Sequence, residues 1–329
     1  MAVLAVFLGV SSAVVAGPLP PVRTGHFFVT NFKGNDVIQY DGAGVAVRRF
    51  TDAEMDGPRG IVIGPNRIFV AAQTGDAVVV FDADGAHVET FTSPELDGPT
   101  GMAWGPGGLL YVCSFENDSI VAFAPDGTVA HSFSGRGLKS PTCIATSGGW
   151  IYVSGPASPW IFRFDPSGTL RATFTGGGLV SPAGLAVYGG RLYVADRGSN
   201  RVVILDGTGN LEDEFTHDDL AGPQGLAFDD RGNLFVSSCY RNTIVQFDRS
   251  GRHVQTITAG KLSFPDGIAF ESRRVGDIDD DGVVGMADFS SLIAAWGSCP
   301  SPSRACPGDV TRNGTVDVSD LYILLANWD

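Results

Sequence analysis

The fold is decided by the stretch PAGLAVYGGRLYVADRGSNRVVILD at residues 182–206. It contains three short runs rich in aliphatic, β-branched and aromatic residues: GLAV (184–187), RLYVAD (191–196) and RVVILD (201–206). A fourth run, LEDEF, follows at 211–215. Turn residues separate the runs, including GG at 189–190 and GTG at 207–209. Runs of this length between tight turns predict four short antiparallel strands.

The same pattern recurs along the chain every 41 or 42 residues. A Pro-x-Gly-apolar-Ala step, with Cys143 replacing the glycine in the third copy, begins at Pro58, Pro99, Pro141, Pro182, Pro223 and Pro265. A turn glycine recurs in the same register at Gly44, Gly85, Gly127, Gly168, Gly209 and Gly251. An apolar residue closes each unit, at Phe50, Phe91, Phe133, Phe174, Phe215 and Ile257. Three markers at one spacing predict six copies of one structural unit.

Four antiparallel strands in about 41 residues form one blade of a β-propeller. The first unit starts at HFFVTN (26–31), which matches a second strand, and the last ends at GIAF (267–270), which matches a first strand. GIAF should therefore complete the blade begun by residues 26–51 and close the ring without a free edge. The sequence thus predicts an all-β, six-bladed propeller over residues 26–271.

The repeats resemble NHL repeats, and the unit that contains PAGLAV and LYVADRGSNRVV is the most similar. The resemblance implies the propeller fold and is compatible with both enzymes and binding modules. In related propellers a site lies at the mouth of the central channel. One set of candidate ligand-binding residues there is the x of each Pro-x-Gly step: Arg59, Thr100, Thr142, Ala183, Gln224 and Asp266. A second set is expected just after the second strand of four blades: Asn31, Ser114, Asp196 and Ser238.

These candidates leave two functional classes open. A zinc lyase would need converging imidazoles, but the histidines other than His26 fall on predicted outer strands or in a loop: His87, His131, His217 and His253. A calcium-dependent lactonase would need several carboxylates or amides together, and the candidates sit on different blades: Asp266, Asn31 and Asp196. Arg59 and Asp266 could form a simple salt bridge or orient a ligand, and Asp196 could cap neighbouring loops. We favour a binding scaffold, with a lyase or hydrolase as the alternative.

The start of the chain bears on where the protein works. Residues 1–16 are apolar and uncharged but short for a membrane span, and Val14 and Ala16 suit a signal peptidase. A signal peptide at 1–16 and a linker at 17–25 predict a secreted or cell-surface protein with no membrane span in the mature chain. An N-terminal anchor or a buried strand is the alternative. The net charge of −14 argues against nucleic acid and permits calcium.

The chain ends in two related acidic stretches, GDIDDDGVVGMADFSSLIAAWG (276–297) and GDVTRNGTVDVSDLYILLANWD (308–329). Both have the spacing of an EF-type calcium loop, with oxygen ligands at alternating positions and glycine at the sixth. The first loop offers Asp277, Asp279, Asp281, the Val283 carbonyl and Asp288. The second offers Asp309, Thr311, Asn313, the Thr315 carbonyl, Asp317 and Asp320. We expect two calcium ions, the second held more weakly because its loop has fewer carboxylates.

An apolar helical pattern follows each loop, at 289–296 and 321–328, and no good helix precedes either loop. This duplicated unit resembles a type I dockerin over residues 275–329. The resemblance implies a small α-helical, EF-hand-like module that folds with calcium and docks onto a cohesin-like protein or cell-surface scaffold, in extracellular polysaccharide processing. The partner-recognition positions differ from the usual hydroxyl pairs: Met286, Ala287, Val318 and Ser319. Cys299 and Cys306, in the connector, predict a small disulfide in an exported protein.

Overall fold

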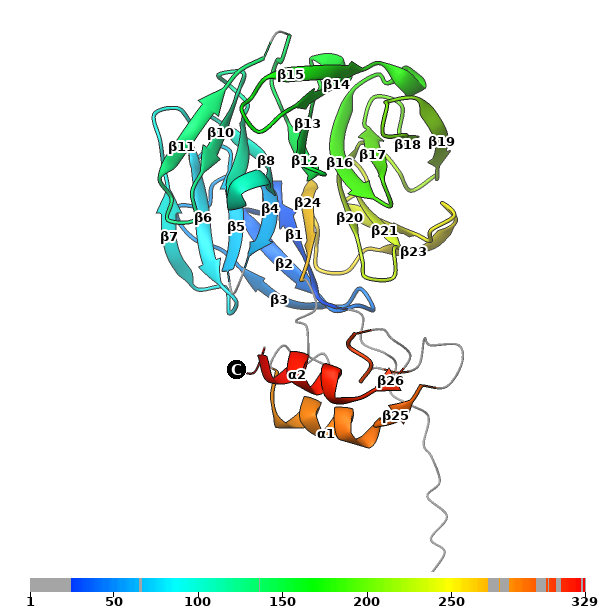
Figure 1. Ribbon diagram of the computed structural model, residues 1–329. Coiled ribbons are helices and arrows are strands. Elements are labelled where there is room, and N and C mark those ends of the chain that lie inside the picture. Colours follow the sequence, from blue (N-terminus) through cyan, green and yellow to red (C-terminus); the bar gives the residue numbers. More distant parts are fainter. Residues whose placement is uncertain are drawn as a thin grey trace, which may run out of the picture.

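The computed structural model describes residues 25–64, 67–135, 137–271, 278, 284–299, 306, 308–311, 315–326 and 328. In this part of the chain, six four-stranded antiparallel sheets are arranged as blades around an axis, and two short helices follow near the C-terminus (Figure 1). The expected signal peptide lies outside the described residues. So do five candidate calcium ligands: Asp277, Asp279, Asp281, Val283 and Asn313.

The strands of each blade run from the channel outwards. Blade 1 consists of β24 (Pro265–Phe270), β1 (Phe27–Asn31), β2 (Asp36–Tyr40) and β3 (Ala46–Phe50). Blade 2 consists of β4 (Pro58–Gly64), β5 (Arg67–Ala72), β6 (Ala77–Asp82) and β7 (His87–Phe91). Blade 3 consists of β8 (Pro99–Trp104), β9 (Leu110–Ser114), β10 (Ser119–Phe123) and β11 (Val129–Phe133).

The second half of the ring has the same order. Blade 4 consists of β12 (Cys143–Ser147), β13 (Trp150–Gly155), β14 (Ser158–Phe164) and β15 (Leu170–Phe174). Blade 5 consists of β16 (Pro182–Tyr188), β17 (Arg191–Asp196), β18 (Arg201–Leu205) and β19 (Leu211–Thr216). Blade 6 consists of β20 (Pro223–Phe228), β21 (Leu234–Ser238), β22 (Thr243–Phe247) and β23 (His253–Ile257). Single 3-10 turns occur at Phe32–Gly34, Pro106–Gly108 and Gly176–Gly178.

The ring closes in blade 1, as the circular repeat pattern predicts. Strand β24, from the end of the propeller, pairs antiparallel with β1, from its beginning, and Phe27 lies opposite Phe270 in this register. The pairing joins chain segments that are more than two hundred residues apart, so the first blade is completed by the last inner strand. This exchange ties the two ends of the sheet ring together and leaves neither as an unpaired edge.

Two of the sequence markers pack directly against each other. Every turn glycine has a positive φ, between 76° and 91°, a region that favours glycine. The space that a side chain would occupy is filled by the closing residue of the preceding blade: the ring of Phe174 lies against Gly209, and the side chain of Ile257 lies against Gly44. The turn glycine and the closing apolar residue therefore recur together because they form one contact between neighbouring blades.

The core lies between the blades. At the closure, Phe27 and Val29 of blade 1 pack with Phe235 and Ile244 of blade 6, and all four are buried. Equivalent clusters fill the other five junctions. Burying one such aromatic side chain contributes about 1.5–3 kcal/mol. Because each blade is covered only by its neighbours, the ring is stable as a closed set.

The C-terminal segment contains two short helices, α1 (Met286–Ala294) and α2 (Val318–Ala326), and a two-stranded pair, β25 (Gly297–Ser298) with β26 (Thr315–Val316). Leu292 and Leu324, one from each helix, share a small core with other apolar residues of the two acidic copies. Cys299 forms a disulfide with Cys306. No helix in the described part of the chain has the length and apolar character needed to cross a bilayer.

The GTG turn between β18 and β19 offers a matched test of the turn marker. Gly209→Ala should lower the free energy of unfolding by about 1–3 kcal/mol, because the methyl group would strain the backbone and overlap Phe174. Gly207→Ala is the control, since a Cβ there meets only one atom, at 4.0 Å. Urea unfolding of both variants measures the effect. Equal stability of the two variants would contradict this packing.

Candidate functional site

The inner strands of neighbouring blades touch at the Pro-x-Gly step. A Cβ atom added at Gly184 would overlap the carbonyl oxygen of Gln224, which is the x residue of the next blade. The same relation holds for four further pairs: Gly60 with Thr100, Gly101 with Thr142, Gly225 with Asp266, and Gly267 with Arg59. The absence of a side chain lets each inner strand approach the next. The contacts hold the six x residues in a ring around the channel.

The ring of x residues surrounds a pocket of about 210 Å³ at the channel mouth. All six members of the first candidate set lie in its lining: Arg59, Thr100, Thr142, Ala183, Gln224 and Asp266. The wall also contains four residues that the sequence analysis did not single out, each directly after a second strand: Gln73, Phe115, Pro156 and Arg197. The pocket therefore combines a polar ring with aromatic and apolar walls, which suits a small ligand with both characters.

The second candidate set does not line this pocket. Its members are buried where loops enter the inner strand of their own blade: Asn31, Ser114, Asp196 and Ser238. Asp196 accepts the N–H groups of Val180 and Ser181 at 3.1 and 2.8 Å, and the hydroxyls of Ser114 and Ser238 each accept a loop N–H at 2.8 Å. In blades 3 and 5 the next residue, Phe115 or Arg197, lines the pocket instead, because successive side chains along the chain point to opposite faces.

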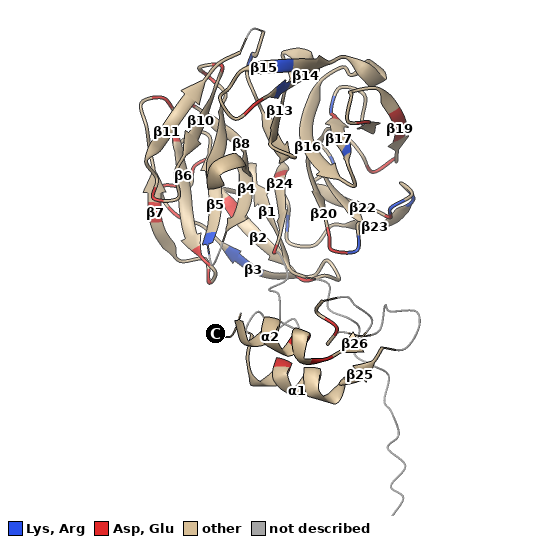
Figure 2. Ribbon diagram, in the orientation of Figure 1, with Lys and Arg blue, Asp and Glu red and all other residues tan. Residues whose placement is uncertain are grey.

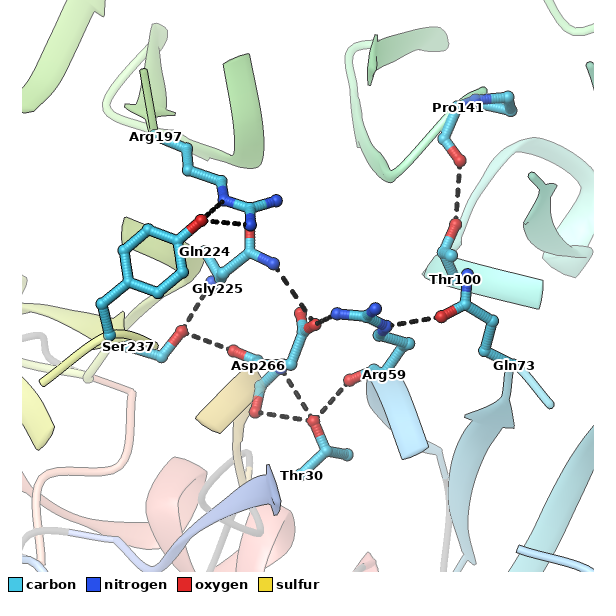
Figure 3. A network of polar contacts seen from close by, with 12 residues as sticks. Thr30, Arg59, Gln73, Thr100, Pro141, Arg197, Gln224, Gly225, Ser237 and Asp266 are labelled. Atoms are coloured by element: carbon cyan, nitrogen blue, oxygen red, sulfur yellow. Dashed lines mark hydrogen bonds and ion pairs between the residues drawn. The ribbon is translucent and has the colours of Figure 1, made fainter. Parts of the chain in front are cut away.

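Charged groups occupy one side of the ring. Arg59 Nη1 donates to a carboxylate oxygen of Asp266 at 2.7 Å, and both side chains are largely buried, at 20% and 17% exposed. Arg59 Nε donates to Gln73 at 2.7 Å, and Gln224 donates to Asp266 at 3.5 Å. Asp266 thus lies between Arg59 and Gln224 (Figure 3). This network joins blades 1, 2 and 6 across the ring closure.

Three aromatic residues, Phe32, Tyr240 and Phe264, form what we call the aromatic rim. The centroid of the Phe264 ring lies 5.8 Å from that of Phe32 and 6.0 Å from that of Tyr240. The Arg59 guanidinium lies 3.8 Å from the centroid of the Phe32 ring. Arg197 donates to the Tyr240 hydroxyl through Nε at 3.2 Å and through Nη2 at 2.5 Å. Cations over aromatic faces are attracted electrostatically, so the rim holds both guanidinium groups in place.

The backbone of Phe264 is strained. Its φ is +59°, a value that is a genuine outlier for a bulky residue. Gly57, Gly98 and Gly222 hold the equivalent place before the proline in three other blades, with φ between 58° and 65°. The Phe264 N–H donates to Asn242 Oδ1 at 2.8 Å. The N–H groups of Gly57 and Gly98 donate in the same way to a side-chain oxygen, of Asn35 and of Asp76. A residue of this kind in that conformation costs on the order of 1–3 kcal/mol.

The thiol of Cys143 lies in the pocket wall and is the only thiol among the described lining residues. Burial, with a smaller contribution from the charge of Asp266, raises the pKa of Cys143 to about 11 against opposing hydrogen bonds from the backbone. The thiol is therefore protonated at neutral pH, and only the thiolate is an effective nucleophile. Asp266 is the only carboxylate among the described lining residues, and none of them is a histidine.

Two histidines and an aspartate come together outside the channel. Ligand atoms of His217, Asp219 and His253 lie within 4.8 Å of one another. The two imidazole rings are stacked, with centroids 4.0 Å apart and planes 7° from parallel. Ring nitrogens offer their lone pairs in the ring plane, so parallel stacked rings do not aim at one ion. This arrangement fits ring stacking between the loop after β19 and strand β23, and it carried no repeat signal in the sequence.

Six of the candidate calcium ligands fall on described residues: Asp288, Asp309, Thr311, Thr315, Asp317 and Asp320. Asp288 and Asp320 occupy the same place in the two copies. Asp288 accepts the Gly285 N–H at 2.8 Å, and Asp320 accepts the Asp317 N–H at 2.9 Å. Both carboxylates are almost completely buried. Each copy therefore places an acidic residue in the first turn of its helix, bonded to the backbone that precedes the helix.

Comparisons with known proteins agree with this architecture. Residues 179–205 match the NHL repeat family. No curated protein sequence matches the chain. The chain is thus a six-bladed β-propeller that carries an NHL repeat, followed by two short helices.

Solved structures share the fold at low identity. A catalytically inactive virginiamycin B lyase from Staphylococcus aureus with quinupristin is 16% identical, with 76% of this chain and 89% of that chain covered and a TM-score of 0.59. A chain of a nidogen/laminin complex is 18% identical, with 74% and 97% covered and a TM-score of 0.65. A protein of unknown function from Bacteroides caccae is 15% identical, with 76% and 100% covered and a TM-score of 0.60. These likenesses show a common propeller architecture.

Alkylation of Cys143 tests the environment of the pocket wall. Because the thiol has a pKa of about 11, its reaction with iodoacetamide should be slow at pH 7.5 and should rise about tenfold for each pH unit up to pH 10. Peptide mass spectrometry isolates the rate at this residue. A free cysteine derivative is the control and should level off near its pKa of about 8.5. A plateau for Cys143 below pH 9 would show that the thiol is not desolvated.

Proposed function

We propose that this protein is an exported, calcium-binding scaffold whose propeller binds a glycan, peptide or protein ligand at the channel mouth. The observation that carries the proposal is the convergence of all six x side chains on one pocket. A pocket with a few convergent polar groups among apolar walls is the arrangement by which proteins bind small ligands or single groups of larger ones. The C-terminal segment would attach the scaffold to a cohesin-like partner.

The chemistry of the pocket favours binding over turnover. Asp266, the one lining carboxylate, is already paired with Arg59. General acid–base catalysis needs a group that can exchange a proton with the substrate. The guanidinium of Arg59 does not release a proton in a protein, and the carboxylate of Asp266 is engaged by that guanidinium. Fold likeness to a lyase carries no catalytic residue into this pocket, because function depends on the site. Lyase or hydrolase activity remains the rival function, and the ligand experiment below distinguishes the two.

The described residues of the C-terminal segment fit calcium. The ion prefers carboxylate, hydroxyl and carbonyl oxygens in a tightly turned loop. Asp309, Thr311 and Asp317 offer such oxygens in the second copy, and the buried Asp320 lies against the same loop, where it accepts the Thr311 N–H at 2.8 Å. Bound calcium would supply a positive charge that compensates the buried carboxylates of Asp309 and Asp320. Asp288 supports the same reading of the first copy.

The outer surfaces of α1 and α2 support docking to a partner. Large apolar side chains are exposed in equivalent places of the two copies, on the helices for Met286 with Val318 and Ile293 with Leu325, and two residues after each helix for Trp296 with Trp328. These side chains are 39–67% exposed. Exposed apolar side chains grouped in this way mark protein interaction surfaces. Together with the calcium loops, they support attachment to a cohesin-like protein as the function of this segment.

Calcium titration of the full-length protein tests the C-terminal proposal. We expect two unequal sites by calorimetry, and chelation should remove the helical circular dichroism signal of the segment while the propeller stays folded. Asp288→Asn should weaken the tighter site and Asp320→Asn the weaker one, each by about tenfold or more. Asp213→Asn, on an exposed strand of blade 5, is the matched control. Two equal tight sites, or no binding, would refute the proposed module.

A ligand screen tests the pocket. Lactones, glycans and peptides should be offered to calcium-loaded and metal-free protein, and binding followed by ligand-observed NMR. Thr142→Trp fills the pocket and should abolish binding of the ligands found, whereas Val88→Trp, on outer strand β7, should leave it unchanged. Thermal unfolding checks that both variants fold. Binding that survives Thr142→Trp would place the site elsewhere, and turnover of any compound would favour the enzyme.

A further inference from the structure

We propose that the channel-mouth pocket selects a ring that carries a carboxylate group. This inference rests on the proposed ligand-binding function and names the class of ligand. The carboxylate would be bound by Arg59 and Arg197, and the ring would stack on the aromatic rim formed by Phe32, Tyr240 and Phe264. An acidic sugar unit and an aromatic acid share this chemistry.

The hydrogen-bonding groups at the mouth have donors to spare. Within the described chain, Arg59 uses Nε and Nη1 for Gln73 and Asp266, and its Nη2 has no protein acceptor. Arg197 donates to the Tyr240 hydroxyl through Nε and Nη2, and its Nη1 likewise has no acceptor among the described residues. The Thr142 hydroxyl is a buried polar atom without a hydrogen bond. Buried polar groups are normally paired, so this pocket is built to receive an acceptor.

The charge balance points to an anion. Two guanidinium groups and one carboxylate line the pocket, which leaves one positive charge in a protein whose net charge is −14. The whole chain contains 36 Asp and Glu residues against 22 Lys and Arg, and both kinds are spread over the ribbon (Figure 2). A cleft with the opposite sign to the rest of the molecule concentrates ligands of complementary charge. The remaining nitrogen of each guanidinium, Nη2 of Arg59 and Nη1 of Arg197, could donate to one oxygen of a carboxylate, which would give orientation as well as attraction.

Phe264 supplies the argument for a ring. Glycine adopts the same backbone conformation at the equivalent place in blades 2, 3 and 6, at no steric cost. The loop of blade 1 makes the same capping hydrogen bond as its counterparts, so its conformation does not need a phenyl group. Because glycine would adopt this backbone conformation without strain, the presence of phenylalanine points to a role for its side chain. Phe264 is not among the residues that line the pocket, but its half-buried ring lies 5.7 Å from the guanidinium of Arg59, which does line it, so the ring offers a stacking surface beside one of the spare donors.

Binding of two acid and neutral pairs to the calcium-loaded full-length protein tests the inference: galacturonate with galactose, and phenylacetate with phenylacetamide. Acetate is a control ligand that measures how tightly a carboxylate without a ring is bound. Calorimetry should show that at least one acid binds about tenfold or more tightly than its neutral counterpart. Preference for the sugar acid identifies a polysaccharide source, and preference for phenylacetate identifies an aromatic acid.

Three variants locate the effect. Phe264→Gly should weaken binding of the acid at least tenfold, while the melting temperature stays the same or rises because the backbone strain is relieved. Arg197→Gln should weaken the acid and leave its neutral counterpart unchanged. Arg191→Gln, whose side chain pairs with Glu212 on the exposed part of blade 5, is the matched control and should change neither.

Several results would overturn the inference. They are equal affinity for acid and neutral partners, no binding of either acid, or a Phe264→Gly protein that is less stable yet binds normally. If another ligand is bound in these cases and Thr142→Trp abolishes its binding, the pocket is still the binding site and only the ligand class is wrong. If binding survives Thr142→Trp, the proposed function itself has failed.

Discussion

The contact between the Pro-x-Gly glycine of one blade and the x carbonyl oxygen of the next is the constraint on which the channel depends. A side chain at this point would push the inner strands apart, so five of the six steps keep glycine. The exception is Cys143, where the sulfur joins the junction and accepts the Leu185 N–H at 3.3 Å. Hydroxyls reinforce the same carbonyl groups in other blades: Ser237 donates to Asp266 O at 2.6 Å, and Thr30 donates to Arg59 O.

This constraint separates shape from chemistry. The backbone on either side of x is held by its neighbours, whereas the x side chain projects into the pocket and ranges from Ala183 to Arg59. The binding properties of the mouth can therefore change without a change in the ring, which explains why relatives of one fold differ in function. In this chain the distinctive chemistry is concentrated at the closure, where the charged pair and the aromatic rim lie on blades 1, 2 and 6.

The ring and its closure could be predicted because their markers have few alternatives. Gly209 needs a positive φ and space for Phe174, and no other residue provides both. The x residues could be predicted because they are tied to that spacing. Phe115 and Arg197 were missed by one position, because the sequence does not mark where the second strands end. Tyr240 and Phe264 meet through separate loops. The signal that could have revealed Phe264 is its place where three other copies have glycine.

The pairing of the two acidic copies shows a further limit of sequence patterns. Their loop spacing predicts calcium from ligand chemistry alone, but spacing says nothing about which outer surface of a helix is left exposed. In the structure Leu292 and Leu324 lie in the shared core, and Met286, Ile293, Val318 and Leu325 are left exposed.

The most direct test of the channel-mouth site is a crystal structure of the full-length protein with calcium and the tightest-binding acid. It should show the carboxylate within hydrogen-bond distance of Arg59 Nη2 and Arg197, with its ring against Phe264. Density for the acid at a blade edge or on the outer strands, with the mouth pocket holding only water, would contradict it.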